Sequence, residues 1–192
     1  MKKLSGLKKT KVAVFISGTG SNLFNLIKFS KKKNSPILID LIISNNKKAK
    51  GLKYSNLYKI EKKIINFKNL KFAEKKILIC LSKKKINLIC LAGFMKVLSK
   101  NFIQKFNGKI INIHPSLLPK YKGLNTYEKA IINKDKYSGC TVHFVTSKID
   151  SGKIIIQKKV KLSKNESIAS LKKKVQKKEY EIYPKAIKKI LN

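Results

Sequence analysis

Short, uninterrupted apolar runs alternate with longer segments of helical spacing over the first two thirds of the chain. The runs are rich in Ile, Leu and Val, which is typical of strands that are covered on both faces. Because strand and helix alternate, we predict an α/β fold with a mostly parallel, twisted sheet, flanked by helices and joined by right-handed crossovers. The expected strands lie at 11–17, 36–44, 63–67, 86–94 and 109–114, and the expected helices at 23–30, 47–58, 70–85 and 100–106.

The pattern changes after residue 135. Two further apolar runs are joined by a short loop without a helix between them, which predicts an antiparallel extension of the sheet. A long C-terminal helix follows, for which Ser163 and Glu166 fit a capping box and in which Pro184 is expected to cause a kink or a division. No repeat or linker interrupts the chain, so we predict a single domain over 1–192. The two strands are expected at 139–146 and 153–162, and the helix at about 166–191.

Hydropathy and cysteine content indicate neither a membrane span nor a metal site. The longest charge-free apolar run, "INLICLAGFM", is far shorter than the roughly 20 residues that cross a membrane. The basic N-terminal segment leads into no signal-peptide core, so we expect a cytoplasmic protein. Three scattered cysteines without a CxxC pair and two isolated histidines show no metal-ligand spacing, and we therefore expect no metal.

The charge of +37 has two interpretations. A strongly basic chain is typical of nucleic-acid binding. However, all 46 basic residues are lysine, and they are spread along nearly every predicted element. Ile and Asn are also abundant, and because Lys, Ile and Asn have AT-rich codons, this composition is typical of a gene with a high A and T content. A nucleic-acid reader commonly uses bidentate arginine and a stacking platform. We therefore favour composition bias over a dedicated nucleic-acid function, and expect the field to attract small anions.

A glycine-containing turn, "SGTGSN" at 17–22, follows the first strand and opens a helix. Glycine at 18 and 20 lets the backbone turn tightly, and a helix N-terminus offers free N–H donors, so this turn suits a phosphate group. It lacks the third glycine of a dinucleotide fingerprint and the Gly-Lys-Ser/Thr of a P-loop. A tight turn between strand and helix that binds no ligand would account for the same motif equally well.

Two polar residues stand at the carboxyl end of a buried strand in "GKIINIHPSLLPKY". Asn112 and His114 are two positions apart and should share one face of the sheet, at the end where open α/β sheets bind their ligands. An amide can donate to a developing oxyanion and an imidazole can exchange a proton near neutral pH. Asp150, one of only nine acidic residues, could orient an imidazole or simply start a turn. His143 suits a buried structural position or a supporting role.

Five segments together resemble the phosphoribosylglycinamide formyltransferases, folate-dependent enzymes of purine synthesis. The resemblance covers about residues 11–190. The Asn-x-His-x-Ser-Leu-Leu-Pro core is shared with other enzymes that use formyltetrahydrofolate, whereas the glycine turn and "EYEIYP" are more specific. The segments are "VFISGTGSNL", "LAGFMKVLS", "INIHPSLLPKYKGLNTYEKAI", "TVHFVTSKIDSGKII" and "VQKKEYEIYP".

The resemblance assigns roles to particular residues. The catalytic residues that it implies are Asn112, His114 and Asp150. For the phosphoribosylglycinamide substrate it implies phosphate contacts from Gly20, Ser21 and Asn22, and ribose contacts from Glu179 with Gln176 nearby. For the folate it implies Met95, Lys96, Val97, Leu98, Asn112, Thr146, Ser147, Lys148, Ile149 and Asp150. It also implies a cis peptide bond at Leu118-Pro119.

The implied reaction is attack of the glycinamide amine on the formyl carbon of 10-formyltetrahydrofolate, with no metal. Asn112 and a protonated His114 would stabilise the tetrahedral oxyanion, and Asp150 would support the imidazole and move a proton through a water molecule. We expect small-molecule substrates, no membrane partner, and a monomer or homodimer.

The sequence departs from the family pattern in two places. The family often has an arginine near Leu70 that reaches the folate, and Lys68 or Lys71 is the candidate substitute here. Asn125 and Tyr127 stand where the family shows histidines. The alternatives are another formyltetrahydrofolate-using transferase or hydrolase, whose additional domains have no counterpart in these residues, and a basic nucleic-acid-binding protein that retains the fold.

Overall fold

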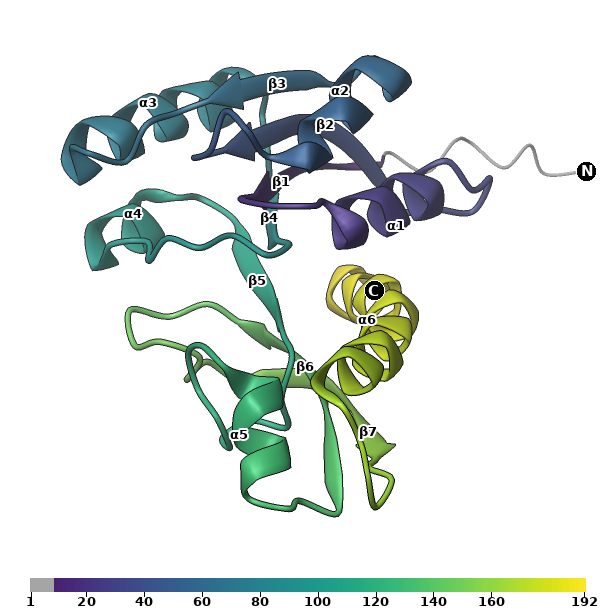
Figure 1. Cartoon of the computed structure of the whole chain (residues 1–192). Coiled ribbons are helices and arrows are strands. Elements are labelled where there is room, and N and C mark those ends of the chain that lie inside the picture. Colours follow the sequence, from purple (N-terminus) through teal and green to yellow (C-terminus); the bar gives the residue numbers. More distant parts are fainter. Residues whose placement is uncertain (1–8) are drawn as a thin grey trace, which may run out of the picture. The chain divides into compact units, whose positions relative to one another are not determined.

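A computed structural model describes residues 9–192, which form two compact units (Figure 1). The first unit contains the chain up to Lys96 together with Gln104–Lys109, and the second contains Val97–Ile103 and Ile110–Asn192. Residues 1–8, which belong to the N-terminal segment interpreted above as no signal peptide, lie outside the described residues. The strands follow the order β3-β2-β1-β4-β5-β6-β7 in a seven-stranded sheet, which confirms the predicted fold class.

The first unit holds the parallel part of the sheet. β1 pairs in parallel with β2 and β4, and β2 pairs in parallel with β3. Every residue of β1 from Val12 to Ile16 is fully buried, which is why this strand carries no polar alternation. The strands are β1 (Thr10–Ile16), β2 (Ile37–Ser44), β3 (Glu61–Ile64) and β4 (Leu88–Leu91), and the helices are α1 (Ser21–Ser30), the 3-10 turn η1 (Lys50–Leu52), α2 (Lys53–Tyr58) and α3 (Leu70–Lys83).

The second unit holds the antiparallel part. β5 pairs with β6 and β6 pairs with β7, both antiparallel, as expected from the loss of strand-helix alternation after residue 135. The Leu118-Pro119 peptide bond is cis. The remaining elements are α4 (Lys100–Lys105), β5 (Lys109–His114), α5 (Thr126–Ile132), β6 (Tyr137–Phe144), β7 (Ile154–Lys161) and α6 (Ile168–Leu191).

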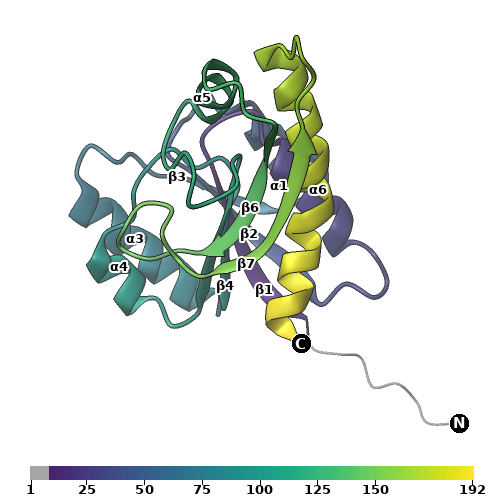
Figure 2. The same cartoon turned by 90° about the horizontal axis from the view of Figure 1, so that it is seen from below.

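The long C-terminal helix α6 lies along β6 and β7 (Figure 2). Its buried stripe follows helical spacing, and the fully buried Tyr183 places its hydroxyl 3.4 Å from the carbonyl oxygen of Ile111. The buried residues of the helix are Leu171, Val175, Glu179, Ile182, Tyr183, Ala186 and Ile187. The helix therefore covers one face of the antiparallel strands.

The start of α6 differs from the predicted capping box. Glu166 does accept the N–H of Ser163 at 3.0 Å, but the helix begins later, and its N-cap is Ser167, which accepts the N–H of Ser170. The side chain of Lys174, that of Ser170 and the Ser163 N–H lower the pKa of Glu166 to about 2. The segment 163–166 is thus a short turn ahead of the helix.

Four other expectations need correction. The helix predicted at 47–58 is the short pair η1 and α2. The strand predicted at 63–67 is β3, which begins two residues and ends three residues earlier than predicted. Helix α5 was not predicted. The predicted division of the helix at Pro184 is wrong, because α6 continues through this residue as one helix. Within residues 9–192, no helix is both long and apolar enough to cross a membrane.

Candidate active site

A row of polar side chains crosses the three antiparallel strands of the second unit. In the register of the sheet, Asn112 lies opposite His143, and His114 lies opposite Thr141, which in turn lies opposite Gln157. Positions two apart on a strand share a face, and directly paired residues share it across strands. The register therefore places these five side chains on one face of β5, β6 and β7.

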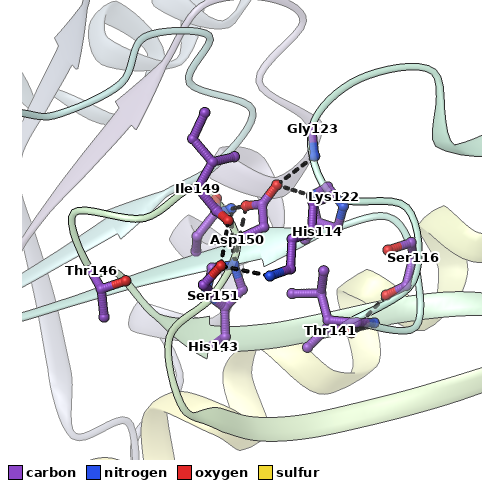
Figure 3. A network of polar contacts seen from close by, with 12 residues as sticks. His114, Ser116, Lys122, Gly123, Thr141, His143, Thr146, Ile149, Asp150 and Ser151 are labelled. Carbon is purple, nitrogen blue, oxygen red and sulfur yellow. Dashed lines mark hydrogen bonds and ion pairs between the residues drawn. The ribbon is translucent and has the colours of Figure 1, made fainter.

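Asp150 joins this face from the loop between β6 and β7 (Figure 3). Its Oδ2 accepts the backbone N–H of Gly123 at 2.9 Å and lies 3.3 Å from Nδ1 of His114, while its Oδ1 lies 3.4 Å from Nδ2 of Asn112. The loop returns tightly because Gly152 packs against the Phe144 carbonyl, where a Cβ atom would stand only 1.8 Å from the oxygen. The structure thus brings together Asn112, His114 and Asp150.

The hydrogen bonds of His114 define its tautomer. Nε2 lies 2.8 Å from the carbonyl oxygen of Tyr121, and since a carbonyl can only accept, Nε2 must carry a proton. Nδ1, which faces Asp150, is therefore the nitrogen that gains or loses a proton. Burial lowers the pKa of His114 below its ordinary value, although the Tyr121 carbonyl and the Asp150 charge act in the opposite direction.

Asp150 is held as a carboxylate. Burial alone would raise its pKa, but the contact with the His143 ring, whose Nε2 lies 3.5 Å from Oδ1, the hydrogen bond from the Gly123 N–H and the charge of His114 lower the pKa below the usual aspartate value. The side chain is only 11% exposed. A buried carboxylate beside an imidazole favours the protonated ring and can receive its proton.

His143 supports the amide of Asn112. Its Nδ1 donates to the Phe144 carbonyl at 2.8 Å, so in the neutral ring Nε2 is an acceptor, and it lies 3.3 Å from Nδ2 of Asn112. The amide nitrogen of Asn112 is therefore held between His143 and Asp150, with its N–H groups facing acceptors. Both distances are long for hydrogen bonds, so these N–H groups can be redirected toward a stronger acceptor.

The glycine turn lies in the first unit, at the start of α1. Gly20 is the N-cap residue with φ of 73°, and a Cβ atom there would stand 2.6 Å from Cα of Gly51. Gly51 donates its N–H to the Gly18 carbonyl, so two backbone segments touch directly. Only glycine at position 20 permits this approach, and the N–H groups of the first turn of α1 follow it directly.

A cavity of about 660 Å³ lies in the same unit, beside the ends of β1, β2 and β3. Ser17 organises its rim, because its hydroxyl contacts Asn45 and accepts the N–H of Met95 at 2.7 Å. Three lysines line the cavity, and among the described residues no acidic side chain does. The lining consists of Ser17, Asn45, Asn46, Lys47, Ile64, Asn66, Phe67, Lys68, Met95 and Lys96.

Comparison with known proteins identifies the family. The formyl transferase family model matches residues 10–187. The chain belongs to this family. The resemblance inferred from the sequence motifs is therefore confirmed.

Individual relatives of this formyl transferase cover most of its length. Phosphoribosylglycinamide formyltransferase of Haemophilus influenzae is 42% identical over 93% of this chain and 85% of that protein. The human trifunctional purine biosynthetic protein adenosine-3 is 43% identical over 94% of this chain, which spans only 18% of that relative. The crystal structure of phosphoribosylglycinamide formyltransferase from Brucella melitensis is 37% identical, with a TM-score of 0.90 over 95% of this chain and 96% of that one.

The other predicted site residues of the formyl transferase lie on three further segments. Met95, Lys96 and Val97 are exposed, whereas Leu98 is buried. Residues 146–149 form the exposed part of the loop that carries Asp150. Gln176 and Glu179 lie on α6, where Glu179 is buried. Burial, and then the charge of Glu179, raise the pKa of Tyr127, one of the residues that depart from the family pattern.

Sequence reasoning missed two contacts of this formyl transferase site. The Tyr121 carbonyl and the Gly123 N–H are backbone groups, which no side-chain pattern displays. Gly123 has φ of 76° and Tyr121 has φ of 56°, so the Gly in "YKGL" was the one signal of an unusual turn. In the described part of the chain, no group of three or more His, Cys, Asp or Glu residues could hold a metal ion.

Proposed function

We propose that the chain transfers the formyl group of 10-formyltetrahydrofolate to the amine of 5-phosphoribosylglycinamide. The products are 5-phosphoribosyl-N-formylglycinamide and tetrahydrofolate, in purine (IMP) biosynthesis. The observation that carries the proposal is the contact of one largely buried carboxylate, that of Asp150, with both His114 and Asn112 in a chain of the formyl transferase family. The names of the bacterial relatives support this choice of acceptor.

Asn112 and His114 stabilise the negative charge that develops on the formyl oxygen. The amide of Asn112 offers its N–H groups once they turn from the long contacts to His143 and Asp150. His114 adds a positive charge beside that amide when Nδ1 is protonated. A single donor of this kind is typically worth about 3 kcal/mol of barrier.

Asp150 and His114 carry the proton balance. The attacking amine must lose a proton and the departing folate nitrogen must gain one, so one group has to hold a proton in between. Nδ1 of His114 faces Asp150 at 3.3 Å, and this pair is suited to that task, with a water molecule relaying the proton to the substrates. Because Nε2 is fixed on the Tyr121 carbonyl, the exchange occurs at Nδ1.

The substrate groups are assigned by the sequence resemblance and supported by local chemistry. Gly20, Ser21 and Asn22 supply a helix N-terminus for the phosphate, which suits an anion. Gln176 and Glu179 on α6 are proposed to contact the ribose. For the folate we propose Met95, Lys96, Val97, Leu98 and the loop 146–150.

Lys68 is our candidate for the position where the family commonly has arginine. It lines the 660 Å³ cavity together with Met95 and Lys96, and Lys71 does not. The cavity wall is basic, which suits a carboxylate of the folate. Lysine presents a point charge where arginine offers a bidentate fork, so we expect weaker folate binding than with arginine.

Three broader expectations remain part of the proposal. The 192 residues act as one formyltransferase domain, as a monomer or homodimer, in the cytoplasm. The substrates are small molecules, and no dedicated nucleic-acid partner is required. The other activities in the name of the human trifunctional relative belong to that protein, of which this chain spans 18%.

A direct assay tests the proposed reaction. Purified protein is incubated with 10-formyltetrahydrofolate and 5-phosphoribosylglycinamide, and both products are quantified by absorbance and mass spectrometry. We expect turnover by the wild type and its loss in a His114→Ala variant that keeps the wild-type circular dichroism spectrum. Undiminished turnover in His114→Ala would remove the function assigned to His114.

Control reactions separate the alternatives. Tetrahydrofolate release without the ribonucleotide would indicate a hydrolase, and formylation of initiator tRNA in place of phosphoribosylglycinamide would indicate another transferase. Salt-sensitive RNA or DNA binding without any turnover would favour the nucleic-acid alternative.

A further inference from the structure

The loop 116–123 supplies both backbone groups that contact the catalytic side chains. Its Tyr121 carbonyl accepts Nε2–H of His114 at 2.8 Å, and its Gly123 N–H donates to Asp150 at 2.9 Å. Tyr121 has φ of 56°, a conformation that non-glycine residues rarely adopt. Such a backbone conformation persists only where surrounding contacts hold it.

Buried hydrogen bonds from β6 hold the first part of this loop. The hydroxyl of Thr141, a fully buried residue, donates to the Ser116 carbonyl at 2.6 Å (Figure 3). The same hydroxyl accepts the Leu118 N–H at 3.1 Å. The Ser116 hydroxyl donates to the Lys120 carbonyl at 2.6 Å, directly before Tyr121. A continuous path of hydrogen bonds therefore runs from Thr141 to the residue before the Tyr121 carbonyl.

Gln157 on β7 completes this network from outside. Its Nε2 donates to the Leu118 carbonyl at 2.7 Å and to the Thr141 hydroxyl at 3.0 Å. Thr141 then has one donated and two accepted bonds, which is the full capacity of a hydroxyl. The direction of each bond is therefore fixed. The Leu118 N–H and the Gln157 Nε2–H can only donate to the Thr141 hydroxyl, so its own proton points to the Ser116 carbonyl.

We propose that Gln157 is a positioning residue for the formyl transfer, acting through Thr141 and the loop 116–121 to hold the Tyr121 carbonyl on Nε2 of His114. This inference rests on the proposed function only for its kinetic consequence. Its structural content is that Gln157 decides which nitrogen of His114 carries the fixed proton, and so leaves Nδ1 for exchange with Asp150.

The test compares three variants on β7. Gln157→Met removes both N–H donors without adding charge, Gln157→Lys retains N–H donors on a flexible chain, and Lys161→Met is the control at an exposed position of the same strand. Gln157 is itself exposed, so its replacement leaves the core intact. We expect Gln157→Met to lower kcat about tenfold with KM unchanged, because small displacements of a catalytic group slow the chemical step. Gln157→Lys should recover most of the loss.

Nitrogen-15 NMR of the imidazoles gives a readout that needs no substrate. The chain has only two histidines, and a His143→Gln spectrum assigns their signals. The titratable groups that face His114 are Asp150 and His143, and neither is replaced in the β7 variants. We expect Gln157→Met to lower the pKa of His114, since the Tyr121 carbonyl raises it, and to increase the fraction of the Nδ1–H tautomer.

The two readouts separate failure of this inference from failure of the proposed function. A wild type without formyl transfer would refute the function, while the His114 titration would still test the network. A Gln157→Met variant that matches Lys161→Met in kcat and in the His114 titration overturns the inference, as does a Gln157→Lys variant as impaired as Gln157→Met. If Gln157→Met does not fold, Thr141→Ser and Thr141→Val make the same comparison, with the hydroxyl kept or removed.

Discussion

Replacing Asp150 with asparagine isolates the charge at the centre of the site. The amide has nearly the same shape and keeps an oxygen that can accept the Gly123 N–H, so the loop contact at 2.9 Å survives. What disappears is the negative charge 3.3 Å from Nδ1 of His114. At an effective dielectric constant of about 20, two unit charges at that distance attract each other by about 5 kcal/mol.

This magnitude sets the expected kinetic effect. Water that enters the altered site offsets part of the lost attraction, and a remaining loss of about 4 kcal/mol corresponds to about a thousandfold in kcat. The pKa of His114 should also fall, because the charge of Asp150 raises it. Tetrahydrofolate formation between pH 6 and 9 measures kcat, and nitrogen-15 NMR follows the imidazole.

Asp40→Asn is the matched control. Asp40 lies on β2, where it pairs with Lys11 at 3.2 Å and Lys84 at 3.6 Å, so the same chemical change removes a charge outside the proposed site. We expect its kcat to equal that of the wild type. If Asp150→Asn retains kcat within threefold of Asp40→Asn, the reasoning about the buried carboxylate is refuted.

Three further predictions concern stability, measured by urea or pH titration. Gly20→Ala should lower the free energy of unfolding by about 3 kcal/mol, because alanine is unfavourable at this positive φ and its Cβ atom would overlap Gly51. Gly18→Ala is the control, because the space at its Cβ position is open, and it should leave the free energy of unfolding unchanged. Equal losses for the two variants would contradict this reasoning. Ser167→Ala should lower the free energy of unfolding by about 1 kcal/mol, because it removes the N-cap of α6, and Ser163→Ala should lower it less. The reverse order would indicate that the helix is capped at Ser163, as the sequence pattern predicted. The pKa of Glu166 is about 2 in the folded protein, so its ion pair with Lys174 stabilises the fold at a pH above the unfolded-state pKa, and this stabilisation is lost as the pH falls toward 2. Glu166→Gln should therefore reduce the dependence of the free energy of unfolding on pH in the acid range. An unchanged dependence would exclude a contribution from the Lys174–Glu166 pair.

The sequence predicted the central strands well because their burial leaves little freedom. A strand covered on both faces must be apolar throughout, and β1 and β4 show this directly. β3 was misplaced because it is an edge strand whose residues are mostly exposed, so no apolar run marks it. α5 was missed because it has only seven residues and its N-cap, Asn125, makes no side-chain hydrogen bond.

The site was predictable to the extent that it follows strand periodicity. Asn112 and His114 share a face because they are two residues apart, and both contact Asp150. The approach of Asp150 itself depends on the close packing of Gly152 against the Phe144 carbonyl, which is a tertiary contact. The Tyr121 carbonyl and the Gly123 N–H could not be predicted, because backbone groups leave no pattern of residue types. The hydrogen bonds of Thr141 and Gln157 that hold this loop could not be predicted for the same reason.

A comparison of single and triple replacements tests whether Asn112, His114 and Asp150 act as one catalytic unit. The kcat of formyl transfer is measured for Asn112→Ala, His114→Ala, Asp150→Ala and the variant with all three changes. Because groups that act together are strongly non-additive, we predict that the triple variant is no more than about tenfold slower than His114→Ala. Losses in kcat that multiply over the three positions would show that the residues act independently and would contradict a single catalytic unit.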